Sequence, residues 1–175
     1  MKKTILFLLI SSLMISSFIS CNKTDTVDEA NLQIRITDAP TALEQVNIDI
    51  QRVMVKYRDD DNDSTLNWVT LNTQAGIYNL LLLQNGVDTL LATGIIPQRQ
   101  IKEIRLILGT NNTVKNNGSI YPLTIPSGSE SGLKIKFSKK LDQSLNILLI
   151  DFDAAMSVSQ DGSGNYKLKP VIRIK

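Results

Sequence analysis

The chain has 175 residues, enough for one ordinary domain. It carries 19 basic and 17 acidic side chains, no histidine and a single cysteine, Cys21. Without histidine, Ser-His-Asp and Cys-His catalytic sites are excluded, and one cysteine forms neither an internal disulfide nor a thiolate metal cage. The near-neutral charge argues against nucleic acid as a partner.

The first 20 residues have the three parts of a secretory signal. Lys2 and Lys3 give a basic start, a largely apolar run covers residues 4–19, and small Ser20 precedes Cys21. The apolar run is shorter than the roughly 20 residues of a membrane-spanning helix, so a retained transmembrane anchor is the weaker alternative. We therefore expect a cleaved signal peptide over residues 1–20.

Cys21 indicates which kind of signal this is. Residues 18–21 read FISC and resemble a lipobox, in which the chain is cut before a cysteine that receives lipid. We expect lipidation of Cys21 rather than a buried free thiol, and a flexible tether over residues 21–31. The expected location is the outer membrane, with the domain facing the periplasm or the cell surface. Loss of Lys2 and Lys3 with the signal leaves 17 basic and 17 acidic residues.

From Leu32 onward, apolar and polar residues alternate with the period of two that is typical of half-buried strands. The phase slips between Ile50 and Val53, which predicts a β-bulge near Gln51-Arg52. A hairpin is expected around Asn117-Gly118 within residues 114–123. The remaining strands are expected over residues 32–37, 46–57, 68–71, 104–108, 133–137, 145–152 and 166–174, and residues 90–96 continue as an apolar segment up to Pro97.

Two segments leave alternatives open. Residues 77–83 fit a short strand or a helical turn, and they end at Asn85-Gly86, a strong hairpin signal. Pro170 predicts an edge strand or a bulge in the last segment. Many short strands without a sustained helical period predict a single all-β domain over residues 32–175. We expect an antiparallel β-sandwich, immunoglobulin-like or transthyretin-like, with closure into a barrel left open.

Several phrases, taken together and in order, resemble one family. They are ITDAP at 36–40, WVTL at 68–71, YNLLLLQNGVDTLLATGIIP at 78–97, IKEIRLILGTNN at 101–112, YPLTIPSGSESGLKI at 121–135, LIDFDAAMSV at 149–158 and YKLKPVIR at 166–173. This set resembles the DUF4382 family, a domain of unknown function common in bacterial lipoproteins. The resemblance runs from about Leu32 to Ile174 and implies an all-β extracytoplasmic domain, without an activity or catalytic residues. Gln98-Arg99-Gln100 departs from the pattern, since relatives tend to carry a small residue and Gly there.

Asp151 and Asp153 are the most suggestive acidic pair. On an extended strand they share one face, roughly 7 Å apart. Asp38 would join them if its strand ends nearby. The functional interpretations are a calcium site or an acid/base pair. The favoured alternative is structural, with the carboxylates bonded to backbone amides or to Arg and Lys. Apart from calcium at this site, no cofactor is expected.

A second acidic run lies at residues 59–63. Asp59, Asp61 and Asp63 alternate as in a calcium loop, but Ser64 and Thr70 stand where that loop needs Gly and Glu. We therefore interpret this segment as a solvated hairpin tip.

Lys134 and Lys136 alternate with apolar residues and form a basic stripe that continues to Lys140. The stripe is either a solvated face that protects a sheet edge or a set of contacts for an acidic glycan or lipid headgroup. Trp68 could stack on a sugar ring.

The leading functional hypothesis is a non-enzymatic binding or scaffolding module, tethered to the membrane through lipid on Cys21. Its expected partner is a glycan or a protein of the cell envelope, not nucleic acid. One alternative is a calcium-assisted carbohydrate-binding module built around Asp151 and Asp153. Another is a hydrolase that uses the same carboxylates.

Overall fold

The computed structural model describes residues 28–58, 66–126 and 132–175. The predicted signal peptide, Cys21 and most of the tether lie outside the described residues. So do the acidic hairpin tip at 59–65 and the serine-rich segment at 127–131. Within the described ranges, no helix is long and apolar enough to cross a membrane.

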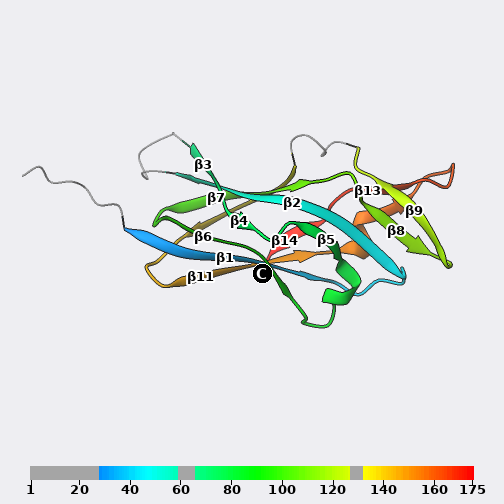
Figure 1. Ribbon diagram of the computed structural model, residues 1–175, viewed down its shortest axis with the longest axis horizontal. Coiled ribbons are helices and arrows are strands. Elements are labelled where there is room, and N and C mark those ends of the chain that lie inside the picture. Colours follow the sequence, from blue (N-terminus) through cyan, green and yellow to red (C-terminus); the bar gives the residue numbers. More distant parts are fainter. Residues whose placement is uncertain (1–27, 59–65, 127–131) are drawn as a thin grey trace, which may run out of the picture.

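Two layers of strands pack face to face (Figure 1). Sheet A contains, in spatial order, β14 (Ile172–Ile174), β11 (Leu145–Phe152), β1 (Glu29–Asp38), β6 (Thr89–Pro97) and β4 (Asn72–Thr73). Sheet B runs through β10 (Leu133–Lys140), β7 (Gln100–Leu108), β2 (Gln45–Arg58), β8 (Thr113–Asn116), β9 (Ser119–Thr124), β13 (Tyr166–Leu168) and β12 (Val158–Gln160). Two further strands, β3 (Leu66–Thr70) and β5 (Gly76–Asn79), also pair with β2. The predicted single all-β sandwich is confirmed.

The core lies between the two sheets and is formed by the inward positions of the alternating strands. Leu32, Ile34 and Ile36 of β1 are almost completely buried. In β2 the inward face slips by one residue, because the register against β7 shifts between Ile50 and Arg52. The extra residue, Gln51, is the predicted β-bulge, and it lets Ile50 and Val53 share the core.

Most strand pairs are antiparallel, but β1 with β11 and β9 with β13 are parallel pairs. Thr37 lies opposite Asp151, and Asp38 lies opposite Phe152. The strands β1 and β11 are far apart in sequence, and the chain enters sheet A at β11 directly from β10 of sheet B. No tight hairpin therefore joins β11 to a neighbour in sheet A and forces an antiparallel pair. As a result, the C-terminal ends of β1 and β11 meet at one edge of sheet A.

Both interpretations of residues 77–83 are realised in succession. The strand β5 ends at Asn79, whose side chain accepts a hydrogen bond from the Leu81 amide and begins the 3₁₀ helix η1 (Leu80–Leu83). Asn85 and Gly86 have φ of 58° and 84° and connect η1 to β6, so this turn does not join two paired strands.

Asn117-Gly118 forms the predicted hairpin turn. The two residues have φ of 49° and 75°, and Asn116 lies opposite Ser119 across the β8–β9 pair. Two central residues with positive φ are the mark of a tight two-residue hairpin loop.

The last predicted strand is wrong as one continuous element. Residues 166–168 form β13 in sheet B, whereas residues 172–174 form β14 in sheet A. Pro170 lies in the connection, where its missing N–H costs no strand hydrogen bond. The chain therefore crosses between the sheets at the residue that sequence had marked as an edge or a bulge. A further single turn, α2 (Ala154–Ser157), follows β11.

Candidate functional site

The three predicted carboxylates come from strands that are neighbours in space but do not meet at one point: Asp38 and Asp153 lie close enough for their charges to interact, whereas Asp151 lies apart from them. Asp38 ends β1, and Asp151 lies in the parallel neighbour β11. Asp151 is in register with Thr37, one residue before Asp38, so the alternation of the strands turns Asp38 toward the core and Asp151 toward the outer face. In the part of the chain that the structure describes, no three His, Cys, Asp or Glu side chains are grouped so that they could hold a metal ion.

Asp151 is 1% exposed and bound to two cations of the C-terminal strand. Its Oδ2 accepts hydrogen bonds from the Arg173 guanidinium, with Nε at 2.7 Å and the ion pair to Nη2 at 2.6 Å. Lys175 Nζ lies 3.1 Å from Oδ1 in an ion pair without hydrogen-bond alignment. This carboxylate therefore joins β11 to β14.

Asp153 lies beyond β11, which ends at Phe152. Its side chain accepts a hydrogen bond of 2.9 Å from the Met156 amide and caps the N-terminus of α2. The expectation that Asp151 and Asp153 share one strand face is wrong, because the strand stops between them. The geometry therefore agrees with structural carboxylates and offers no observation in favour of calcium.

Asp38 is buried at the sheet edge, 4% exposed. Its Oδ1 accepts a hydrogen bond of 2.9 Å from the Ala154 amide, and its Oδ2 accepts one of 3.3 Å from Gln84 Nε2. Burial raises the pKa of the Asp38 carboxyl above its ordinary value of 3.8, and these hydrogen bonds only partly oppose the change.

The raised pKa of Asp38 predicts a specific pH dependence. The native chain takes up a proton at Asp38 before the unfolded chain does as the pH falls, so the wild type gains stability relative to Asp38→Asn. The gain accumulates between the raised native pKa and the ordinary value near 3.8. Urea unfolding of both proteins across this range measures the difference in unfolding free energy. A wild type that loses stability relative to the variant there would contradict the assignment.

The other predicted contacts do converge, on the outer face of sheet B. Trp68 of β3 lies opposite Lys56 of β2, which lies opposite Glu103 of β7, and Glu103 lies opposite Lys136 of β10. This row crosses four strands that are distant in sequence. The inward neighbours of these residues, such as Val55 and Ile104, are fully buried, so the row itself faces outward.

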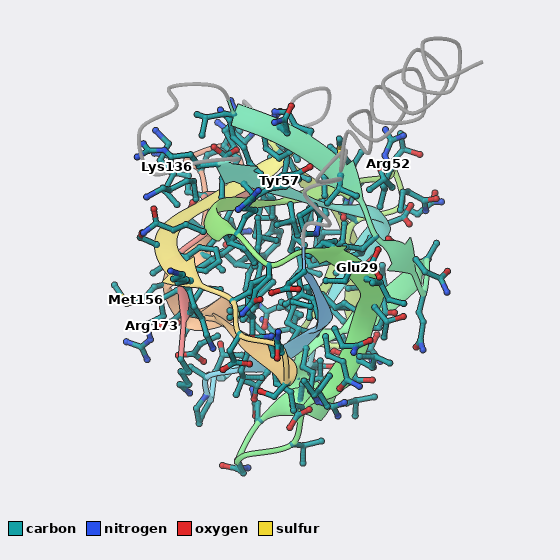
Figure 2. All side chains as sticks on the ribbon, turned by 90° about the vertical axis from the view of Figure 1, so that its left-hand side faces the viewer. Glu29, Arg52, Tyr57, Lys136, Met156 and Arg173 are labelled. Atoms are coloured by element: carbon teal, nitrogen blue, oxygen red, sulfur yellow. The ribbon has the colours of Figure 1, made fainter. Side chains whose placement is uncertain are left out.

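A second row runs beside the first. Thr70 of β3 lies opposite Met54 of β2, followed by Arg105 of β7 and Lys134 of β10. Lys102 precedes Glu103 in β7, and its Nζ donates a hydrogen bond of 3.2 Å to Ser138 Oγ of β10. We call this surface the basic face and define it by Lys56, Trp68, Lys102, Arg105, Lys134 and Lys136. Figure 2, viewed along the molecule, shows Lys136 at the margin of the upper layer, above Arg173 and Met156.

Two cations of this face lie over the Trp68 ring. The Arg105 guanidinium carbon lies 4.2 Å from the centroid of the indole ring, and Lys56 Nζ lies 5.5 Å from it. Cations at these distances are attracted by the electron-rich ring face. Arg105 therefore reaches across β2 and stacks on a ring from the next strand but one.

Glu103 is the acidic residue within the two rows. Its Oε1 accepts hydrogen bonds from Arg105 Nε at 3.2 Å and Nη2 at 2.8 Å, and its side chain is 9% exposed. Because Glu103 lies beneath its partner, it fixes the guanidinium on Trp68 and presents little negative charge to solvent.

The sequence pattern predicted Trp68, Lys134 and Lys136 as ligand contacts but did not predict Lys56, Lys102 and Arg105. The alternation of residues 101–108 places Arg105 on the polar side of its strand, so the sequence predicts that the Arg105 side chain points outward. Its proximity to Trp68 was not, because that depends on which strands pair.

A cavity of about 580 Å³ lies beside Lys134, between β10 and the β13–β14 connection. Its lining includes Pro126, Leu133 and Pro170. Pro126 and Gly132 flank residues outside the described ranges, so we assign no role to this cavity.

Comparison with known proteins adds one relationship. The model of the family described as "Domain of unknown function (DUF4382)" matches residues 29–170, which agrees with the resemblance seen in the sequence motifs. Searches of curated proteins and of solved structures return no match. The match covers nearly the whole β-sandwich, from the start of β1 to the crossing at Pro170, and the chain therefore belongs to the DUF4382 family.

Proposed function

We propose that this protein is a lipid-anchored, non-catalytic binding module of the bacterial outer membrane that binds its ligand through the basic face. One observation carries the binding part of the proposal. Trp68, Lys134 and Lys136, chosen as ligand contacts from sequence alone, come from two strands far apart in the chain and lie on one face of sheet B. Further cations, Lys56 and Arg105, lie between them.

The anchoring part rests on the amino-terminal sequence and on where the first strand begins. Cys21 follows a basic start and an apolar run, and β1 begins at Glu29. The intervening chain spans at most about 30 Å when fully extended. Lipid on Cys21 would therefore hold the sandwich within a few nanometres of the bilayer. The blue start of β1 lies at one end of the long axis of the sandwich (Figure 1).

Two features favour binding over catalysis. The chain has no histidine to activate a serine or a water. The carboxylates that might replace it are committed to the fold: Asp151 to Arg173 and Lys175, Asp153 to the α2 cap, and Asp38 to Ala154.

Cys21→Ser tests the anchor. We expect the wild type to fractionate with membranes and to incorporate labelled palmitate, because several acyl chains together hold a protein firmly in a bilayer. The variant should lose the label and should not appear as processed protein in the outer membrane.

The matched control is Ser12→Ala, which alters the apolar run without touching the cysteine. It should behave as the wild type. Palmitate incorporation that persists in Cys21→Ser, or outer-membrane association of the processed variant, would overturn lipid anchoring through this residue.

A further inference from the structure

We propose that the basic face recognises an acidic polysaccharide, with anionic groups of the sugar chain on the cations and a sugar ring against Trp68. This inference rests on the proposed function, since it names the ligand class of the same face.

The cations of the basic face repeat at the spacing of the strands. Arg105 lies directly opposite Lys134, and Lys136 follows on the same side of β10. Adjacent strands are about 4.8 Å apart, and same-face residues along one strand are about 7 Å apart. The positive charges therefore form a two-dimensional array, which fits a ligand carrying a series of negative charges.

The array lies on an open sheet surface. Lys134 and Lys136 are exposed on the edge strand β10. A single exposed ion pair contributes only about 0.2–1 kcal/mol, so an isolated small anion would bind such a surface weakly. A polymer engages several cations at once, and each contact after the first is intramolecular. The surface therefore favours a polyanion over a single charged group.

The surroundings of Trp68 favour a polysaccharide over other polyanions as the ligand. Its ring lies beneath the Arg105 guanidinium, 4.2 Å away, and beside Lys56. An indole with a guanidinium next to it offers apolar ring surface beside a positive charge, which suits the C–H face of a sugar ring next to a carboxylate. A membrane-inserting surface would instead project bare apolar side chains, whereas this ring is partly buried and has a cation next to it.

Glu103 strengthens this assignment. It binds the guanidinium of Arg105 through two nitrogens and so fixes its plane. Lys56 and Lys136 lie opposite Glu103 on the two neighbouring strands. Glu103 therefore has a lysine on each side and does not make this part of the surface negative.

The experiment uses the full chain in nonionic detergent micelles. Trp68 is the sole tryptophan of the chain, so intrinsic fluorescence reports directly on the basic face. The probe is polygalacturonate. Dextran serves as the neutral polysaccharide, and double-stranded DNA and micelles containing phosphatidylglycerol represent the other polyanion classes.

We expect a saturable change of Trp68 fluorescence with polygalacturonate that weakens as salt is added, and none with dextran. In calorimetric titrations, the triple variant Lys56→Gln, Lys134→Gln and Lys136→Gln should bind about tenfold more weakly, since it removes three exposed charge contacts. The control triple Lys115→Gln, Lys167→Gln and Lys169→Gln changes net charge equally and should stay within about twofold of the wild type.

Three results would overturn the proposal. They are the absence of saturable polygalacturonate binding, an equal loss in the control triple, and tighter binding of DNA or phosphatidylglycerol than of polygalacturonate. Tighter binding of DNA or lipid that disappears in the Lys56, Lys134 and Lys136 variant would reject the polysaccharide while keeping the face as a binding surface. None of these measurements depends on the anchor, so their failure is separate from the outcome of Cys21→Ser.

Discussion

Gly109→Ala is expected to destabilise the fold by about 3–5 kcal/mol, because the added methyl group has no room. A Cβ at Gly109 would overlap Oδ2 of Asp49 and lie 2.6 Å from its carboxyl carbon. Asp49 is 2% exposed and cannot move into solvent without losing its hydrogen bonds. Thermal unfolding should show a melting temperature lower by about 10 °C.

The damage is large because Asp49 organises the loop that follows β7. Its carboxylate accepts hydrogen bonds from the Gln51 side chain and from the Asn111 amide, at 3.2 Å for the latter. Its own amide donates to Asn112 Oδ1 at 2.9 Å, and its carbonyl accepts from the Gly109 amide at 2.8 Å. A methyl group at Gly109 would disturb this whole network.

Gly76→Ala is the matched control. A Cβ there meets no atom within 4 Å, and Gly76 does not have a positive φ. Alanine at a compatible position restricts the unfolded chain and stabilises by about 0.4–1 kcal/mol. Equal losses in the two variants would show that the cost is general to glycine replacement and not due to Asp49.

Phe152→Ala should cost about 3–5 kcal/mol, the usual range for emptying a buried aromatic site. Phe152 is 1% exposed and heads the fully buried side chains by volume. It lies opposite Asp38 on β1 and opposite Ile172 on β14. The cavity would therefore open at the place where three strands of sheet A meet. Urea unfolding measures the loss of unfolding free energy.

Leu145→Ala provides the comparison on the same strand. Leu145 begins β11 and is 52% exposed, so its truncation removes little buried area and should cost less than about 1 kcal/mol. A cost for Phe152→Ala no greater than that for Leu145→Ala would contradict the placement of Phe152 in the core.

Local features of this fold could be predicted because they depend on neighbours in sequence. The alternation in β1 and β2 marks their inward faces, and the slip between Ile50 and Val53 marks the bulge at Gln51. Asn117-Gly118 specifies its own turn through two positive φ angles. Each signal is contained within a few residues, so no knowledge of partners was needed.

Features that depend on distant partners could not be predicted. Nothing in residues 145–152 indicates that they lie parallel to β1, since that follows from the change of sheet after β10. The separation of β13 from β14 at Pro170 has the same origin. Pro170 marked the position of the break, but which sheet each half joins is decided by the packing of the whole sandwich.

The candidate site also has parts that the sequence predicts and parts that depend on distant partners. Lys134 and Lys136 share a strand, so their common direction was predictable from alternation alone. Trp68 joins them only because β3, β2, β7 and β10 lie side by side. Asp151 and Asp153 failed as a pair because Asp153 caps α2 instead of continuing the strand. A carboxylate next to a helix start satisfies backbone amides as readily as it would bind a metal.

We propose that the ligand binds the basic face and not the aspartate edge of sheet A. The most direct measurement is a titration of the isotope-labelled chain with polygalacturonate, followed by amide and indole chemical shifts. We expect the signals of the Trp68 indole and of the Arg105, Lys134 and Lys136 amides to shift together with a single dissociation constant. Shifts gathered around Asp38 and Asp151, with Trp68 unchanged, would contradict it.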